Sequence, residues 1–358
     1  MSGAPEDFTG LPDLASRALG GTVLYANDEF FASAHNLIEP RPAGHDPAAF
    51  GIRGKEYDGW ETRRRREPGA DFVIIRLAAP AIVRGVNIDT SHFRGNYPPA
   101  GSVDGATLLG YPPAGVVLAA AWAPLTGRTD LEGDRANLVP VTAPDRLVTH
   151  VRLTIHPDGG VARLRVFGEV VPDPRRLGGR VDLAATCTGG RVEACSNMFF
   201  SRPANVLAPG RAQVMSDGWE TARRRDDGHD WLVVRLAVPG VLHHAVIDTT
   251  RFVGNAPGLA RLSDEETGTE LLPRTGLVPD TEHWFRIRAG GAATGGAANS
   301  DPRPTGLVRL DIYPDGGISR LRLVGVVPPE RREQIARRWL SLLPADVAAG
   351  VDQGEFFD

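Results

Sequence analysis

Asp58-Gly-Trp-Glu-Thr62, followed at once by the run Arg63–Arg66, decides the architecture because the chain contains this stretch twice. It recurs 159 positions later as Asp217-Gly-Trp-Glu-Thr221, and Arg223–Arg225 again follow it. A repeat of about 160 residues has the length of a domain and is too long for a solenoid unit. The sequence therefore predicts a tandem duplication.

Further segments recur in the same order in both copies. Ile88-Asp-Thr90 returns as Ile247-Asp-Thr249, and each copy closes with Pro-Asp-Gly-Gly, at 157–160 and 314–317. Pro172–Gly179 is the natural connection between the copies. The predicted organisation is a first domain at 1–172, a linker at 173–180, a second domain at 181–328 and a C-terminal helix with an acidic tail at 329–358.

The local patterns favour strands in both copies. Val151–Ile155 alternates apolar and polar residues, as a strand with one wet face does. Many short β-branched runs without a βαβ rhythm indicate an antiparallel β-sandwich in each copy. Pro-Asp-Gly-Gly between two runs predicts a hairpin. The expected strands are Phe72–Leu77, Gly85–Asp89, Val148–Ile155 and Val161–Phe167, with Trp231–Leu236, Ala245–Asp248, Leu307–Ile312 and Ile318–Val324 in the second copy.

Three segments depart from this strand pattern. Pro329–Leu343 has helical periodicity, and its stripe of Trp339, Leu340 and Leu343 is expected to pack on a domain or a neighbouring subunit. The last dozen residues are acidic and are predicted to fray. Ala292–Asn299 is a low-complexity insertion.

Composition excludes several classes of protein. Forty basic and 44 acidic residues give a net charge of -4, which argues against nucleic acid or an anionic membrane as a partner. No stretch approaches 18 consecutive apolar residues, and the polar N-terminus lacks the apolar region of a signal peptide. Cys187 and Cys195 are too few for a disulfide scaffold or a four-ligand zinc site. We expect a cytoplasmic protein.

The repeated motif allows a structural and a functional interpretation. Trp60 is best read as a core aromatic residue. Glu61 and its counterpart Glu220 stand beside arginines that would keep a carboxylate ionised. If the strand continued, alternation would direct Arg64 and Arg66 to one side, as a fork suited to a carboxylate or a urea carbonyl. The run is equally compatible with a solvated surface.

Structural roles are favoured for the polar residues near the strand ends. Asp89 suits the capping of a loop, and Asn96, which follows a glycine, suits the left-handed region. His92 and His156 are more often surface residues than catalysts. The sequence contains no dedicated metal motif, nucleophile elbow, P-loop or dinucleotide fingerprint.

Long segments of the chain resemble the allantoicase family. The resemblance extends from about Gly20 to Val327 and includes the duplication itself. Departures are His156 where the family usually has tyrosine, and a weakened Gly-Asn-Tyr-Pro motif at Gly254–Pro257, and they predict a less complete site in the second copy. The segments of the first copy that carry the resemblance are YDGWETRRRR (57–66), GVNIDTSHFRGNYPP (85–99) and THVRLTIHPDGGVARLRVFGEV (149–170). Those of the second copy are DGWETARRRDDGHDWLVVRL (217–236), IDTTRFVGNAP (247–257) and LVRLDIYPDGGISRLRLVG (307–325).

The resemblance implies two galactose-binding-like jelly-roll domains that split allantoate into (S)-ureidoglycolate and urea in purine degradation. Such cleavage needs an anion clamp, a proton donor for the departing urea and a base for water. The residues expected to supply them are Glu61, His92 and Glu220 as catalytic groups, and Arg64, Arg65, Arg66, Asn96, Tyr97 and Arg224 as substrate-binding groups.

Alternatives remain at this point. Jelly-roll sandwiches often bind sugars without catalysis, and a relative acting on ureidoglycolate would carry similar motifs. The resemblance implies a small-molecule substrate, a homo-oligomer and no cofactor, and it leaves assistance by a divalent metal open.

Overall fold

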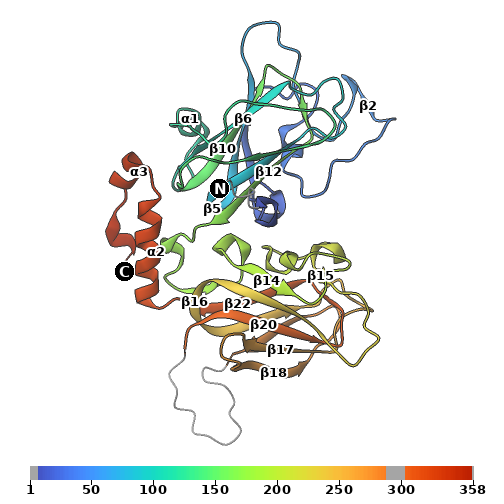
Figure 1. Ribbon diagram of the computed structural model, residues 1–358, viewed down its shortest axis with the longest axis vertical. Coiled ribbons are helices and arrows are strands. Elements are labelled where there is room, and N and C mark those ends of the chain that lie inside the picture. The colour runs from blue at the N-terminus through green and yellow to red at the C-terminus, as the bar shows by residue number, and fades with distance from the viewer. Residues whose placement is uncertain (1–6, 288–302, 357–358) are drawn as a thin grey trace, which may run out of the picture. The chain divides into compact units, whose positions relative to one another are not determined.

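The computed structural model describes residues 7–287 and 303–356, so the insertion Ala292–Asn299 lies outside the described residues. By their internal contacts the described residues form two compact units. One contains the residues up to Val171 together with Leu340–Val351, and the other contains Pro172–Trp339 with the residues from Asp352 onward. Each unit is built mainly from antiparallel strands (Figure 1). The prediction of two tandem all-β sandwich domains is confirmed.

In the first unit the helical segments are short: α1 (Ala114–Leu118) and 3-10 turns at Phe8–Gly10, Arg17–Leu19 and Ala34–Ile38. Its strands are β1 (Thr22–Ala26), β2 (Phe50–Gly51), β3 (Gly54–Lys55), β4 (Trp60–Glu61), β5 (Asp71–Asp89), β6 (Ala100–Ala106), β7 (Ala123–Pro124), β8 (Thr129–Asp130), β9 (Ala136–Pro140), β10 (Val148–His156), β11 (Gly160–Val161) and β12 (Arg163–Val170).

The second unit repeats this order. Helix α2 (Pro329–Ser341) starts in this unit, whereas α3 (Ala345–Ala349) belongs to the first unit. The 3-10 turns of the second unit are Pro174–Arg176, Thr186–Thr188, Pro203–Leu207, Met215–Asp217 and Gln353–Phe356. Its strands are β13 (Arg180–Asp182), β14 (Arg191–Cys195), β15 (Trp219–Glu220), β16 (Asp230–Asp248), β17 (Leu259–Asp264), β18 (Glu270–Gly276), β19 (Glu282–Arg286), β20 (Thr305–Tyr313), β21 (Gly317–Ile318) and β22 (Arg320–Val326).

One long strand organises each sandwich. β5 and β16 are each 19 residues long, whereas the sequence patterns indicated two separate strands in each place. The first half of β5 pairs with β1 and β10, and the second half pairs with β9 and β12. The register of β10 jumps from Arg76 to Ala81 across Pro80, which has no N–H for the ladder. The strand thus contributes one half to each layer.

The same arrangement shows that the predicted Pro-Asp-Gly-Gly hairpin is wrong. β10 and β12 do not pair with each other, because they follow different halves of β5. Residues 157–160 instead cross from one layer to the other, and β11 at their end pairs with β4. The second copy is identical in this respect, since β20 and β22 follow the two halves of β16 and β21 pairs with β15.

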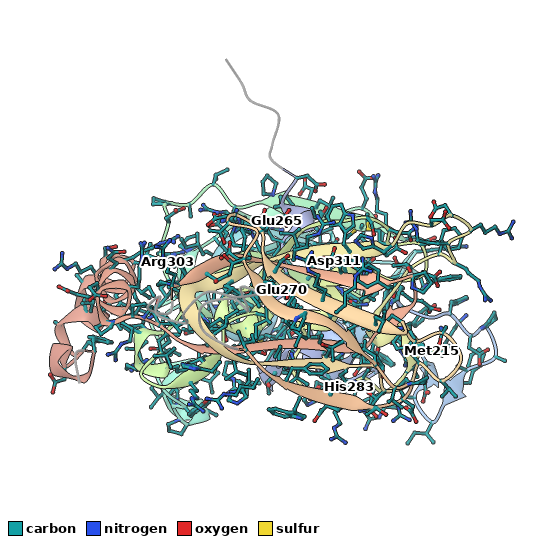
Figure 2. All side chains as sticks on the ribbon, turned by 90° about the horizontal axis from the view of Figure 1, so that it is seen from below. Met215, Glu265, Glu270, His283, Arg303 and Asp311 are labelled. Atoms are coloured by element: carbon teal, nitrogen blue, oxygen red, sulfur yellow. The ribbon has the colours of Figure 1, made fainter. Side chains whose placement is uncertain are left out.

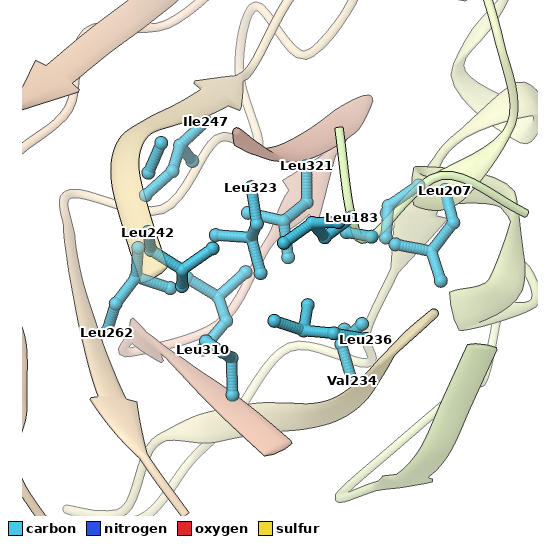
Figure 3. Close-up of a cluster of buried hydrophobic side chains, with 14 of the residues drawn as sticks. Leu183, Leu207, Val234, Leu236, Leu242, Ile247, Leu262, Leu310, Leu321 and Leu323 are labelled. Atoms are coloured by element: carbon cyan, nitrogen blue, oxygen red, sulfur yellow. The ribbon is translucent and has the colours of Figure 1, made fainter. Parts of the chain in front are cut away.

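The inward faces of the two layers form an apolar core in each unit. Leu236, Leu310 and Leu323 lie in the core of the second unit (Figure 3). Trp60 and Trp219 are fully buried, and their indole N–H groups donate to the carbonyls of Asp28 and Asn197 at 2.7 Å. The interpretation of the motif tryptophan as a core residue is confirmed.

The opposite face of the second unit's sheet is charged. Asp311 on β20 and Glu270 on β18 lie on it (Figure 2), and Arg261 on β17 reaches both, at 3.9 Å and 3.2 Å. Arg309 also donates to Asp311, at 2.7 Å. This alternation of a charged and an apolar face explains the period of two in the sequence.

The C-terminal helix is confirmed as α2, in which Ala336 and Trp339 are buried. The prediction that the last dozen residues fray is wrong for Gln353–Phe356, because Phe356 packs on Trp339 with ring centroids 5.6 Å apart. Among residues 7–287 and 303–356, none of the helices has both the length and the apolar character required to cross a membrane.

Gly160 tests the packing at the end of the first sandwich. A Cβ there would lie 2.0 Å from Phe93, which is fully buried, so we expect Gly160→Ala to lower the free energy of unfolding by about 3 kcal/mol. Urea denaturation followed by circular dichroism measures this change. Gly127→Ala is the control, because its Cβ would meet nothing within 4 Å. Equal stability of the two variants would contradict the packing described here.

Candidate functional site

Three recurring motifs meet at one end of the first sandwich. β4 pairs with β11, so that Glu61 lies opposite Gly160. The N–H of Thr62 donates to the carbonyl of Gly159 at 3.1 Å, and the N–H of Gly160 donates to the carbonyl of Asn96 at 2.7 Å. The Asp-Gly-Trp-Glu-Thr, Gly-Asn and Pro-Asp-Gly-Gly motifs therefore recur together because they build one structure.

Gly159 is indispensable to this meeting point. Its φ is +141°, and a Cβ there would lie 2.7–2.9 Å from backbone atoms of Asn96, Tyr97 and Pro98. Only glycine tolerates both the left-handed conformation and this backbone approach.

Glu61 and Asn96 form the central polar pair. The Asn96 side-chain amide donates to a Glu61 carboxylate oxygen at 2.7 Å, and Asn255 donates to Glu220 at 2.5 Å in the second unit. Burial raises the pKa of Glu61 above its ordinary value, while the Asn96 hydrogen bond opposes that rise. A raised pKa makes this carboxylate a stronger proton acceptor than an ordinary glutamate.

Two structural interpretations of neighbouring residues have different outcomes. Asp89 caps its loop as expected, because its carboxylate accepts from the N–H of Ser91 at 2.9 Å. The left-handed conformation expected at Asn96 is wrong; within this loop it belongs to His92, with φ +70°, and in the second copy to Arg251, with φ +75°.

The arginine run does not continue the strand. β4 ends at Glu61, so the expected alternation of Arg63–Arg66 along a strand is wrong. The run forms an irregular loop that lines an open pocket of about 790 Å³. The pocket residues are Asp28, Phe31, Arg63, Arg64, Arg65, Arg66, Glu67 and Asp71.

The arginines of this loop differ in their attachments. Arg65 pairs with the buried Asp71 at 2.6 Å, and its backbone N–H donates to Asp158 at 2.8 Å. Arg63 pairs with Asp28 at 2.8 Å. Arg64 and Arg66 are exposed and make no ion pair or hydrogen bond within the described part of the chain. Arg65 is thus held in place, and the exposed pair is available to a ligand.

The pocket adjoins the polar pair through Phe31. This residue lines the pocket, and its backbone N–H donates to the Glu61 carbonyl at 3.1 Å. In the second unit Arg224 is held as Arg65 is, by Asp230 at 2.8 Å and by Asp315, which accepts from its backbone N–H at 2.9 Å.

Two predicted site residues are attached elsewhere. The His92 ring lies 3.1 Å from the carbonyl of Ala43 and stacks on His45, with centroids 5.1 Å apart. The Tyr97 ring packs so closely on Gly133 that a Cβ there would lie 2.5 Å away. Among the described residues, neither ring is hydrogen-bonded to Glu61 or to Arg63–Arg66.

The aspartates that hold the site are not predicted from the sequence. Asp28, Asp71 and Asp158 anchor the arginine loop, and Asp230 and Asp315 repeat two of these positions. Their recurrence in both copies was the available signal. Among the described residues, no group of three or more His, Cys, Asp or Glu side chains is arranged to hold a metal ion.

The Glu61–Asn96 hydrogen bond can be tested by titration. We expect Asn96→Ala to raise the pKa of Glu61 by about one to two units, because a hydrogen bond to a charged group contributes about 1.5–3 kcal/mol. Carbon-13 NMR of the side-chain carboxyl measures the shift. Asn255→Ala is the matched control and should leave the Glu61 titration unchanged. An unaltered Glu61 pKa in Asn96→Ala would contradict this account of the pair.

Comparison with known proteins places this geometry in context. The model of the family described as allantoicase repeat matches residues 12–171 and 181–328. The chain is 53% identical over 328 residues to a probable allantoicase of Nocardia farcinica, covering 90% of this chain and 96% of that protein. A probable allantoicase of Streptomyces coelicolor is 47% identical over 349 residues, covering 92% and 89%.

A solved structure has the same architecture. The allantoicase crystal structure from Saccharomyces cerevisiae superposes with a TM-score of 0.75 and 32% sequence identity, covering 91% of this chain and 98% of that chain.

Proposed function

The chain belongs to the allantoicase family, and we propose that it hydrolyses allantoate to (S)-ureidoglycolate and urea in purine degradation. The observation that carries the proposal is the half-buried Glu61 carboxylate, held by Asn96 beside a pocket of arginines. This pairing places a group able to move protons next to a site of opposite charge to the substrate.

The substrate matches the polarity of the pocket. Allantoate carries a carboxylate and two ureido groups on one carbon, and a buried carboxylate without a partner is costly. Arginine forks bind carboxylates through two parallel hydrogen bonds. We assign the anion clamp to Arg64, Arg65 and Arg66, with Arg65 fixed by Asp71 and the other two exposed.

The reaction substitutes water for urea at the central carbon. A water oxygen bonds to that carbon while the carbon–nitrogen bond to one ureido arm breaks. We assign Glu61 to accept the proton from water and to return it to the departing nitrogen. Its raised pKa suits both directions of transfer, and Asn96 orients the carboxylate.

The remaining assignments follow from the contacts. His92 and Tyr97 hold loop residues, so we give them no role in this chemistry. The two ureido arms are enantiotopic, and release of one enantiomer requires a site that holds them differently. The proposal includes no cofactor; the homo-oligomer and the cytoplasmic location stay predictions.

Release of urea is the direct test of the proposed function. We expect the purified chain to liberate one urea per allantoate at neutral pH without added NAD, ATP or flavin. A urea assay with and without divalent metal measures this, and ureidoglycolate serves as the competing substrate. If well-folded protein releases no urea under any of these conditions, the enzyme proposal fails and the binding-module alternative is supported. A higher kcat/KM on ureidoglycolate than on allantoate would identify a related hydrolase.

Glu61→Gln isolates the proton transfer. The change keeps the side-chain volume and an oxygen for Asn96 but removes the proton acceptor, so kcat should fall by at least about 100-fold with little change in KM. Glu220→Gln is the matched control in the second unit and should have the weaker effect. A wild-type kcat in Glu61→Gln would exclude Glu61 as the base.

Arg64→Lys and Arg65→Lys test the clamp. Lysine keeps the charge but lacks the fork, so we expect KM to rise by about 30-fold, which corresponds to about 2 kcal/mol. Steady-state kinetics measure the change, and thermal unfolding shows whether loss of the Arg65–Asp71 pair disturbs the fold. Near-normal KM values in both variants would mean that the run is a solvated surface.

A further inference from the structure

Arg65 and Arg224 occupy equivalent positions and share their buried partner. Arg65 Nη1 lies 2.6 Å from Asp71 Oδ1, and Arg224 Nη1 lies 2.8 Å from Asp230 Oδ1. Asp71 and Asp230 are both almost completely buried. This ion pair uses only Nη1 of each guanidinium group. The edge formed by Nε and Nη2 is left for a second acceptor.

In the second unit a side chain of the protein covers that edge. Arg224 Nε donates to Asp226 Oδ1 at 2.9 Å, and Arg224 Nη2 donates to Asp226 Oδ2 at 3.2 Å. Asp226 also accepts from the backbone N–H of Gly228 at 2.9 Å, which fixes its rotamer. The result is a two-point arginine–carboxylate pair within one short loop.

In the first unit the same edge has no carboxylate. Glu67 takes the place of Asp226, and it makes no ion pair within the described residues. Arg65 Nε is shielded from water and has no hydrogen-bond partner among the described residues. A buried donor without an acceptor is destabilising, so a local rearrangement that brings a carboxylate onto Nε is favoured.

An equivalent glycine lies against each guanidinium group, although of the two only Gly69 has a φ in the left-handed range, +151°. A Cβ on Gly69 would lie 2.5 Å from Arg65 Nη2, and a Cβ on Gly228 would lie 2.6 Å from Arg224 Nη2. A glycine therefore packs on both guanidinium groups, and the side chain two residues before it pairs with the arginine only in the second unit. Glutamate at this place has one more methylene than aspartate and is followed by Pro68.

We propose that the carboxylate of the substrate binds the Nε–Nη2 edge of Arg65 in the way that Asp226 binds Arg224, and that Asp226 closes the equivalent subsite. Each chain then has a single carboxylate subsite, in the first unit. This inference rests on the proposed function for the identity of the ligand, and it adds which repeat binds it and why the other does not.

Competition explains why an exposed aspartate suffices to close the subsite. The Asp226–Arg224 pair is on the surface, where one ion pair contributes little free energy. A carboxylate two residues from its arginine is nevertheless present at an effective concentration of millimolar or more. A free ligand in the millimolar range has to displace it, whereas Arg65 presents no such competitor.

The experiment is a count of binding sites by isothermal titration calorimetry on the full chain. The probe is N-carbamoylglycine, which has a carboxylate and one ureido group but lacks the second ureido group that hydrolysis releases. We expect one site per chain in the wild type, at least tenfold weaker binding in Arg65→Lys, and two sites per chain in Asp226→Ala. The double variant Asp226→Ala/Arg224→Lys should return to one site.

Asp227→Ala is the matched control. It removes an adjacent, exposed acidic side chain that makes no contact with Arg224 among the described residues, so the net charge changes equally and one site should remain. Two sites in the wild type, one site in a folded Asp226→Ala, or two sites in Asp227→Ala would each overturn the inference. Urea release from allantoate is measured separately, so loss of the proposed activity with the expected site counts would contradict the function alone.

Discussion

The pairing of β4 with β11 is the contact on which the candidate site depends. It is only two residues long, yet it places Glu61 opposite Gly160 and Thr62 against Gly159. The same glycine turn also holds Asn96, because the N–H of Gly160 donates to the Asn96 carbonyl. Without a side chain at 159 and 160, three separate segments approach closely enough for Asn96 to reach Glu61.

The long strand β5 provides the frame for this contact. Because its two halves belong to different layers, β10 and β12 are separated and the Pro-Asp-Gly-Gly segment must cross the end of the sandwich. That crossing is what carries Gly159 and Asp158 to the arginine loop. The layer change and the site both depend on the register shift across Pro80.

Duplication gives an internal comparison that a single domain lacks. The units share the carboxylate–amide pair, the arginine–aspartate pair and the buried tryptophan, so both copies build the same local framework. They differ at Glu67 and Asp226, where a short aspartate folds back on its arginine and a longer glutamate does not.

The sequence by itself determined the duplication, the β class and the candidate motifs, because repeats and a period of two are local properties of the chain. It also identified Glu61, Asn96 and Arg65 as residues to examine. The tertiary structure decided how they are used: β4 stops at Glu61, His92 and Tyr97 turn to other loops, and Asp71 and Asp158 hold the arginines. Strand pairing joins residues almost 100 positions apart, such as Thr62 and Gly159, and no local pattern encodes which distant partner a backbone or a carboxylate will meet.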